Sequence, residues 1–131
     1  VDTTLAGDTP ANQNHTKLGK GVSLTAIDNM TVTNRGLLIY LENLCKKHQI
    51  PYQIGCFTKG GTDAGNIYKS ETGILATTLS IPIRYMHTHQ SIVHLGDIEA
   101  TLRLMCAICE DLTMEKYYQI LEYNYQYGME E

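Results

Sequence analysis

The sequence predicts an α/β domain built on a mainly parallel or mixed β-sheet, and three observations lead to this prediction. Segments typical of strands alternate along the chain with segments of helical periodicity. A glycine-rich turn, GGTDAG, directly follows one of the expected strands. The stretch 74–83, ILATTLSIPI, is almost continuously apolar, as is typical of a strand buried on both faces.

The expected strands are short and are separated by turn-forming residues. VDTTLA at the start of the chain is rich in β-branched residues, which favour extended backbone. The stretch GDTPANQNHTKLGKG that follows is a loop, because Gly, Asn, Thr and Pro dominate it. The strands are predicted at 1–6, 22–28, 52–57 and 74–83.

Four helices are predicted from caps and apolar spacing. Thr33 or Asn34 can cap a helix that runs to about His48 and stops before Pro51. A short helix is expected at 63–68, and a last one at 113–125. Asp97 can cap a helix through about residue 111. Its expected apolar stripe consists of Ile98, Leu102, Met105 and Cys109.

Composition limits the class of protein and its partners. The 131 residues suffice for one domain, and 43% hydrophobic with 18% charged residues is ordinary for a globular chain. The net charge is −4 and the basic residues form no patch, which argues against nucleic acid and anionic membranes as main partners. The apolar runs are shorter than the roughly 20 residues that span a bilayer.

The four cysteines are expected to be reduced and mostly buried, as in a cytosolic protein. Cys106 and Cys109 form a C-x-x-C in the middle of a predicted helix, whereas a redox pair lies at a helix N-terminus. A second C-x-x-C, which would suggest a zinc site, is absent from the sequence.

Two segments contain side chains that can bind metals. Asp2 is either a residue of a frayed terminus or a metal ligand at a strand end. RYMHTHQ follows the predicted buried strand, where open α/β sheets place their sites. His87 and His89 would point the same way on extended backbone, and they are either surface histidines or include a ligand through neutral imidazole.

The GGTDAG turn has a structural and a functional interpretation. Asp63 could cap the helix that follows, which needs no ligand. Alternatively, the glycines let backbone approach a ligand while Thr62 and Asp63 orient neighbouring groups by hydrogen bonds. The evidence for a phosphate-binding loop is weak, since the turn lacks the lysine and the residue spacing of a P-loop.

Five segments in this order resemble one known family: VDTTLAGDTP, IPYQ, GGTDAG, LSIPIRYMH and HLGDIEATLRL. The family is that of the glutamyl aminopeptidases, two-metal peptidases also called deblocking or tetrahedral aminopeptidases. The resemblance covers nearly the whole chain, and GGTDAG together with RYMH is the most specific part. It implies that residues 1–131 are the C-terminal segment of a mixed-sheet, three-layer zinc-peptidase catalytic domain.

The resemblance also implies roles for individual residues. Asp2 matches a metal-binding carboxylate of the family, and His87, rather than His89, matches the histidine ligand of the RY-x-H motif. Tyr68 stands where family members often have a histidine, which affects the shape of the pocket. The segment expected to support the site consists of Gly60, Gly61, Thr62 and Asp63.

Members of this family are cytosolic enzymes that use two zinc or cobalt ions to remove N-terminal residues from peptides. They assemble into homo-dodecamers. Their His-x-Asp pair, bridging aspartate and Glu-Glu pair lie upstream of the matched region, as does the inserted β-barrel domain. A strand that starts at the first residue also suggests upstream chain. This segment alone is therefore expected to bind metal weakly or not at all and to be inactive.

Two other functions compete with the aminopeptidase. The chain could be a non-catalytic module that self-associates or docks on full-length subunits through apolar sheet edges and faces. Part of the family is also labelled endoglucanase, but glycoside cleavage usually needs two carboxyl groups across the sugar. The quoted motifs place no such pair.

Overall fold

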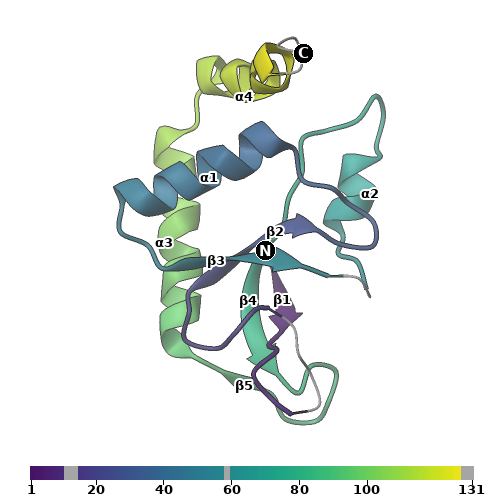
Figure 1. Ribbon diagram of the computed structural model, residues 1–131, viewed down its shortest axis with the longest axis vertical. Helices are drawn as coiled ribbons and strands as arrows, with labels where there is room; N and C mark the ends of the chain where they lie inside the picture. Colours follow the sequence, from purple (N-terminus) through teal and green to yellow (C-terminus); the bar gives the residue numbers. More distant parts are fainter. Residues whose placement is uncertain (11–14, 58–59, 128–131) are drawn as a thin grey trace.

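The structure, a computed structural model, describes residues 1–10, 15–57 and 60–127 (Figure 1). The strands are β1 (Asp2–Leu5), β2 (Val22–Ile27), β3 (Tyr52–Cys56), β4 (Leu79–Arg84) and β5 (Ile92–Val93). The helices are α1 (Arg35–Lys47), α2 (Ala64–Tyr68), α3 (Leu95–Asp111) and α4 (Met114–Tyr127). No helix within these ranges is both long and apolar enough to cross a membrane.

The strands form one mixed sheet in the order β1-β4-β2-β3, with β5 added to β4. The pairs β1–β4 and β2–β3 are parallel, whereas β4 is antiparallel to both β2 and β5. This confirms the predicted mixed sheet. Because β2 opposes β4, the C-terminal ends of β2 and β3 meet the N-terminal ends of β1 and β4 at one edge.

The strands of the sheet end along two opposite edges, and we name each edge by the polar residues found there. The hydroxyl edge contains Asp28, Thr62 and Thr78, where β2 and β3 end and β4 begins. The arginine edge, where β1 and β4 end and β2 begins, contains Asp8, Arg84 and Asp97. The glycine-rich turn belongs to the first edge and the RYMHTHQ turn to the second.

The hydrophobic core lies between the sheet and the helices α1 and α3, which both contact β2. Asn34 caps α1 as predicted, since its side-chain oxygen accepts a hydrogen bond from the backbone N–H of Leu37 at 3.1 Å. The fully or nearly fully buried apolar residues of this core include Val22, Leu24, Leu41, Leu44, Cys45 and Leu104.

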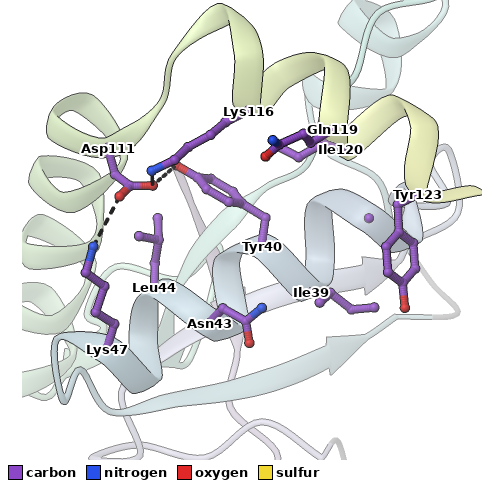
Figure 2. Close-up of a pocket in the computed structure, with 11 residues that line it drawn as sticks. Ile39, Tyr40, Asn43, Leu44, Lys47, Asp111, Lys116, Gln119, Ile120 and Tyr123 are labelled. Carbon is purple, nitrogen blue, oxygen red and sulfur yellow. Dashed lines mark hydrogen bonds and ion pairs between the residues drawn. The ribbon is translucent and has the colours of Figure 1, made fainter.

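Helix α4 packs against α1 and not against the sheet (Figure 1). The helices come close at Gly36, where an added Cβ would lie 2.4 Å from the backbone oxygen of Ile120. At the other end of the contact, Tyr40, Lys47 and Lys116 converge on Asp111 (Figure 2).

The predicted stripe of α3 is wrong. Its expected core residues Ile98, Leu102, Met105 and Cys109 are exposed, and the helix turns a different side to the sheet. That side is formed by Asp97, Ala100, Thr101, Leu104 and Ala107. Small side chains such as Ala100 allow the helix axis to approach the sheet closely, and a count of large apolar residues does not detect such a side.

Three further predictions need correction. The cap of α3 is His94, whose Nδ1 accepts from the N–H of Gly96, so Asp97 is not the cap. The fourth strand covers only Leu79–Arg84, and β5 was not predicted. The four cysteines are free, but only Cys45 is buried, and the other three thiols are exposed.

Candidate functional site

The glycine-rich turn is fixed to the sheet by a short polar network. The Thr62 hydroxyl lies 2.7 Å from the Thr78 hydroxyl and donates to Asp28 Oδ2 at 3.3 Å. Asp28 Oδ1 in turn accepts from the backbone N–H groups of Met30 and Thr31, both at 2.7 Å. Asp28 and Thr78 are buried, so this network ties the turn to the ends of β2 and β4 in a water-poor environment.

The glycines of the turn are required by its shape and its neighbours. Gly60 has φ +92°, a backbone conformation that favours glycine, and its carbonyl accepts from the N–H of Asn29. An added Cβ on Gly61 or Gly65 would lie 2.5 Å from side-chain atoms of Met30. The predicted close approach is therefore made to a loop of the protein itself.

Asp63 is at the N-cap position of α2 but makes no capping hydrogen bond through its side chain. The position predicted for the cap is thus confirmed, but the carboxylate of Asp63 does not stabilise the start of the helix by a hydrogen bond. Its side chain is exposed, as are Gly60 and Gly61, whereas Thr62 is half-buried. Tyr68, at the end of α2, is 40% exposed.

Asp2 lies at the first position of β1, opposite Ser80 of β4, and thus at the hydroxyl edge. Its side chain is exposed. The carboxylate oxygen Oδ1 accepts a hydrogen bond from the backbone N–H of Thr3 at 2.7 Å, which is a contact within its own strand.

His87 lies in the turn between β4 and β5, three residues beyond the last residue of β4. Tyr85 and His87 have φ of +59° and +60°, so the backbone is a tight turn and not the extended segment that was expected. The prediction that His87 and His89 point the same way assumed extended backbone, and this backbone is not extended. The Thr88 hydroxyl lies 2.6 Å from the Tyr85 carbonyl and 2.7 Å from that of Gln90, which stabilises the turn.

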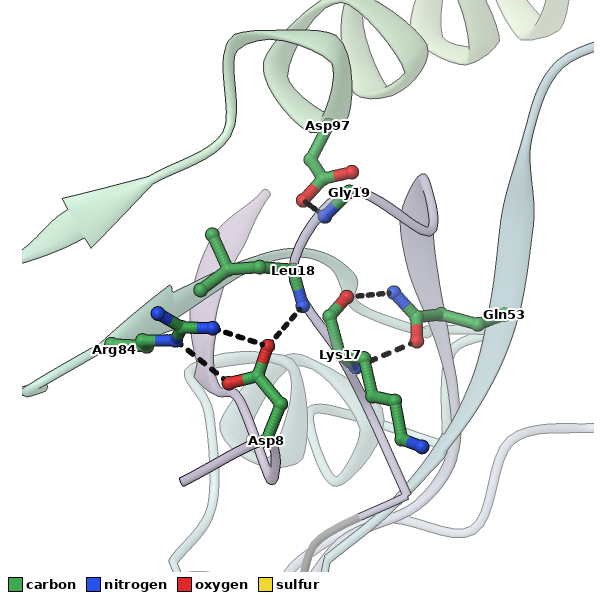
Figure 3. Close-up of polar contacts among 7 residues, drawn as sticks. All are labelled: Asp8, Lys17, Leu18, Gly19, Gln53, Arg84 and Asp97. Carbon is green, nitrogen blue, oxygen red and sulfur yellow. Dashed lines mark hydrogen bonds and ion pairs between the residues drawn. The ribbon is translucent and has the colours of Figure 1, made fainter. Parts of the chain in front are cut away.

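Arg84 connects this turn to the end of β1. Its Nε and Nη2 donate to the two carboxylate oxygens of Asp8 at 2.8 and 3.1 Å (Figure 3). The same carboxylate accepts from the N–H of Leu18. The hydrogen bond from Arg84 lowers the pKa of Asp8, and the pKa of Arg84 is raised by the same contact. Because the ion pair is bidentate, it fixes the orientation of the Arg84 guanidinium relative to the Asp8 carboxylate as well as their distance.

Asp97 holds the loop that precedes β2. Its two carboxylate oxygens accept from the backbone N–H groups of Gly19 and Gly21 at 2.8 and 2.7 Å (Figure 3 shows the Gly19 bond). Asp97 is 1% exposed. Gly21 has φ +89°, and an added Cβ would lie 1.9 Å from the backbone oxygen of Pro51, so no other residue fits there.

The contacts of Asp8, Arg84 and Asp97 at the arginine edge were not predicted from the sequence. All three lie within motifs that were recognised, namely VDTTLAGDTP, RYMH and HLGDIEATLRL. The signal was therefore present, but a sequence does not show which charged residues of a motif contact each other across some 76 positions.

The described residues do not by themselves form a two-metal site. Within the described ranges there is no group of three or more His, Cys, Asp or Glu side chains that could hold a metal ion. Asp2 and His87 belong to different edges of the sheet, since β1 and β4 are parallel and Asp2 pairs with the second residue of β4. A tight zinc site needs three or four ligands, so the described residues alone supply too few ligands for either metal ion.

The chain belongs to the M42 glutamyl aminopeptidase family, whose family model matches residues 1–104. A putative aminopeptidase of Acetivibrio thermocellus is 33% identical over 83% of this chain and 34% of its own length. The glutamyl aminopeptidase of Lactococcus lactis is 31% identical over 94% of this chain and 34% of its own length. The chain thus spans about a third of the curated relatives that it matches.

The fold is shared with solved members of the family. A TET aminopeptidase from a Thaumarchaeota archaeon of marine sediment superposes with a TM-score of 0.86 and 33% identity. The match covers 90% of this chain and 34% of that protein. The architecture inferred from the resemblance is therefore confirmed at the level of the mixed α/β fold.

Proposed function

We propose that this chain is the C-terminal catalytic segment of a metal-dependent aminopeptidase that removes N-terminal residues from peptides. The observation that carries the proposal is the family match over residues 1–104, together with the shared fold. The matched range contains VDTT, GGTDAG and RYMH, which are the motifs on which the resemblance rests.

Within this proposal, the family resemblance assigns one metal ligand each to Asp2 and His87, although the structure places the two residues at different edges of the sheet. The remaining ligands and the general base come from a segment that corresponds to the other two thirds of the relatives. Two properties support these roles. Both side chains are exposed. Neither has a hydrogen bond or ion pair with a side chain elsewhere in the described part of the chain.

Gly60, Gly61, Thr62 and Asp63 have a supporting role in this proposal. Thr62 has the strongest case, because its hydroxyl connects Asp28 to Thr78 at the edge where β1 begins. The ions would be zinc or cobalt, and the compartment would be the cytoplasm. A TET peptidase of Pyrococcus horikoshii is described as assembling into a tetrahedron or a large octahedral shell, and a closed homo-oligomer, such as a dodecamer, is proposed here by analogy.

The test begins with the DNA sequence around the Val1 codon. The proposal predicts an open reading frame that also encodes a His-x-Asp and a Glu-Glu motif upstream. The product of that frame should hydrolyse aminoacyl p-nitroanilides, lose activity to a chelator and recover it with cobalt or zinc. A frame without those motifs, or a product that is inactive with either metal, would reject the proposal.

One observation favours a second candidate, a module that self-associates. Helix α3 exposes an apolar stripe formed by Leu95, Ile98, Leu102 and Met105, of which Leu95 and Leu102 are 78% and 59% exposed. An exposed apolar helix face favours association. Light scattering of the 131-residue chain tests this candidate. Association that disappears in Leu102→Glu and persists in Glu99→Gln supports it, and a monomer at all concentrations rejects it.

A further inference from the structure

A pocket of about 410 Å³ lies between α1 and α4 (Figure 2). Its volume is within the range of small-molecule sites. Ile39 and Leu44 of α1 and Ile120 and Tyr123 of α4 line its body. The family model ends at residue 104, so the whole α4 wall lies outside the family match.

One end of the pocket is charged. Lys116 Nζ lies 2.7 Å from Asp111 Oδ2, and Lys47 Nζ lies 3.3 Å from Oδ1. The hydroxyl of Tyr40 donates to Oδ2 at 3.2 Å. Hydrogen bonding, first of all from Lys116, lowers the pKa of Asp111 to about 2, and burial raises the pKa of Tyr40 to about 12. At neutral pH the cluster therefore has two ammonium groups, one carboxylate and a neutral phenol.

The order of these groups from solvent inward decides which ligand fits. The side chains of Lys47 and Lys116 are 63% and 40% exposed, whereas that of Asp111 is only 14% exposed. An incoming molecule meets the ammonium groups first, and each has three N–H donors, of which the carboxylate uses one. The excess positive charge and the spare donors complement an anion, and the apolar body next to them complements a hydrocarbon chain.

We propose that the α1–α4 pocket binds a small aliphatic carboxylate, with its head group on Lys47 and Lys116 and its chain against Ile39, Leu44 and Ile120. Asp111 holds the two lysines together at the pocket mouth. Asn43 and Gln119 also line the pocket and offer amide groups at its polar margin. The proposal does not depend on the aminopeptidase assignment.

The probe is sodium octanoate, titrated into the ¹⁵N-labelled 131-residue chain. The backbone amide resonances of Gly36 and Gln119 should shift in a saturable manner, while those of Gly61 and Gly65 stay in place. 1-Octanol has the same chain without the charge and should bind at least tenfold more weakly. Acetate, which has the charge without the chain, should cause no saturable shift at the same concentrations.

Lys116→Met keeps the apolar stem and removes the charge, and it should weaken octanoate binding at least fivefold. Lys47→Met should act in the same direction and replaces Lys116→Met if that variant does not fold. The matched control is Lys46→Met, because Lys46 is equally exposed on α1 but pairs with Glu42 and does not line the pocket. The proposal is overturned if octanoate shifts no pocket resonance, if octanol binds equally well, or if Lys46→Met weakens binding as much as the pocket variants do.

Discussion

The two edges of the sheet are stabilised by different kinds of polar contact. At the hydroxyl edge, Asp28 and Thr78 are buried. The Thr62 hydroxyl and two backbone N–H groups donate to the Asp28 carboxylate, and the Thr62 hydroxyl also contacts that of Thr78. At the arginine edge, the contacts are an ion pair between Arg84 and Asp8 and a buried carboxylate, Asp97, on two glycine N–H groups. The side chains in these contacts are thus buried or half-buried at both edges, while the proposed ligands Asp2 and His87 are exposed.

This difference separates residues that build the scaffold from residues that are available for chemistry. A substitution of a scaffold residue should change stability first. A substitution of Asp2 or His87 should leave stability almost unchanged and alter function.

Asp97→Ala should cause the largest loss of stability. The change removes a buried carboxylate and leaves the N–H groups of Gly19 and Gly21 without their acceptor, at a cost of about 3 kcal/mol in the free energy of unfolding. Urea denaturation followed by circular dichroism measures this loss. The control is Glu99→Ala, two residues further along α3 and exposed. If both variants lose the same small amount of unfolding free energy, Asp97 does not stabilise the loop that precedes β2.

Thr62→Val should have an intermediate effect. Valine keeps the shape but loses the hydroxyl that bridges Asp28 and Thr78, which costs about 1.5 kcal/mol for groups of this burial. Thr88→Val, the counterpart in the exposed turn at the arginine edge, should cost less than half as much because water replaces its bonds. Equal losses in the same denaturation experiment would contradict the contrast between a buried and an exposed hydroxyl network.

Asp8→Asn should have the smallest effect on stability, and one that depends on pH. Arg84 lowers the pKa of Asp8 in the folded state below its ordinary value of 3.8. The pair therefore contributes fully above that value, and its contribution is lost as the pH falls through the folded-state pKa. The difference in unfolding free energy between the parent and Asp8→Asn should be greatest near pH 7 and shrink below pH 4. A difference that grows in acid would contradict this account.

Helices and strands could be predicted from the sequence where the residues that determine them are close together in the chain. Asn34 as a cap and Pro51 as a stop located α1, and β-branched residues located β1. The strand predicted from residue 74 begins only at Leu79, and the two threonines before it make side-chain contacts: the Thr77 hydroxyl donates to the Thr25 carbonyl and the Thr78 hydroxyl contacts that of Thr62. Those contacts lie outside the strand ladder and depend on residues that are distant in sequence.

The side of α3 that faces the core could not be predicted for a related reason. The helix has two sides rich in apolar residues, and only packing shows that the side with Ala100 and Leu104 meets the sheet. For the proposed site, the motifs single out Asp2, Thr62 and His87 along the chain. Which edge each residue occupies follows from strand register and polarity, which emerge only when the sheet is assembled.

The most direct test of the central claim compares two histidines of one turn in the product of the complete reading frame. The proposed role of His87 predicts that His87→Ala lowers metal-dependent aminopeptidase activity on the order of 100-fold, with an unchanged unfolding midpoint. His89→Ala, two residues away and also exposed, should retain activity within about twofold of the parent. Full activity of His87→Ala, or an equal loss in both variants, would contradict the claim that this chain provides a metal ligand through His87.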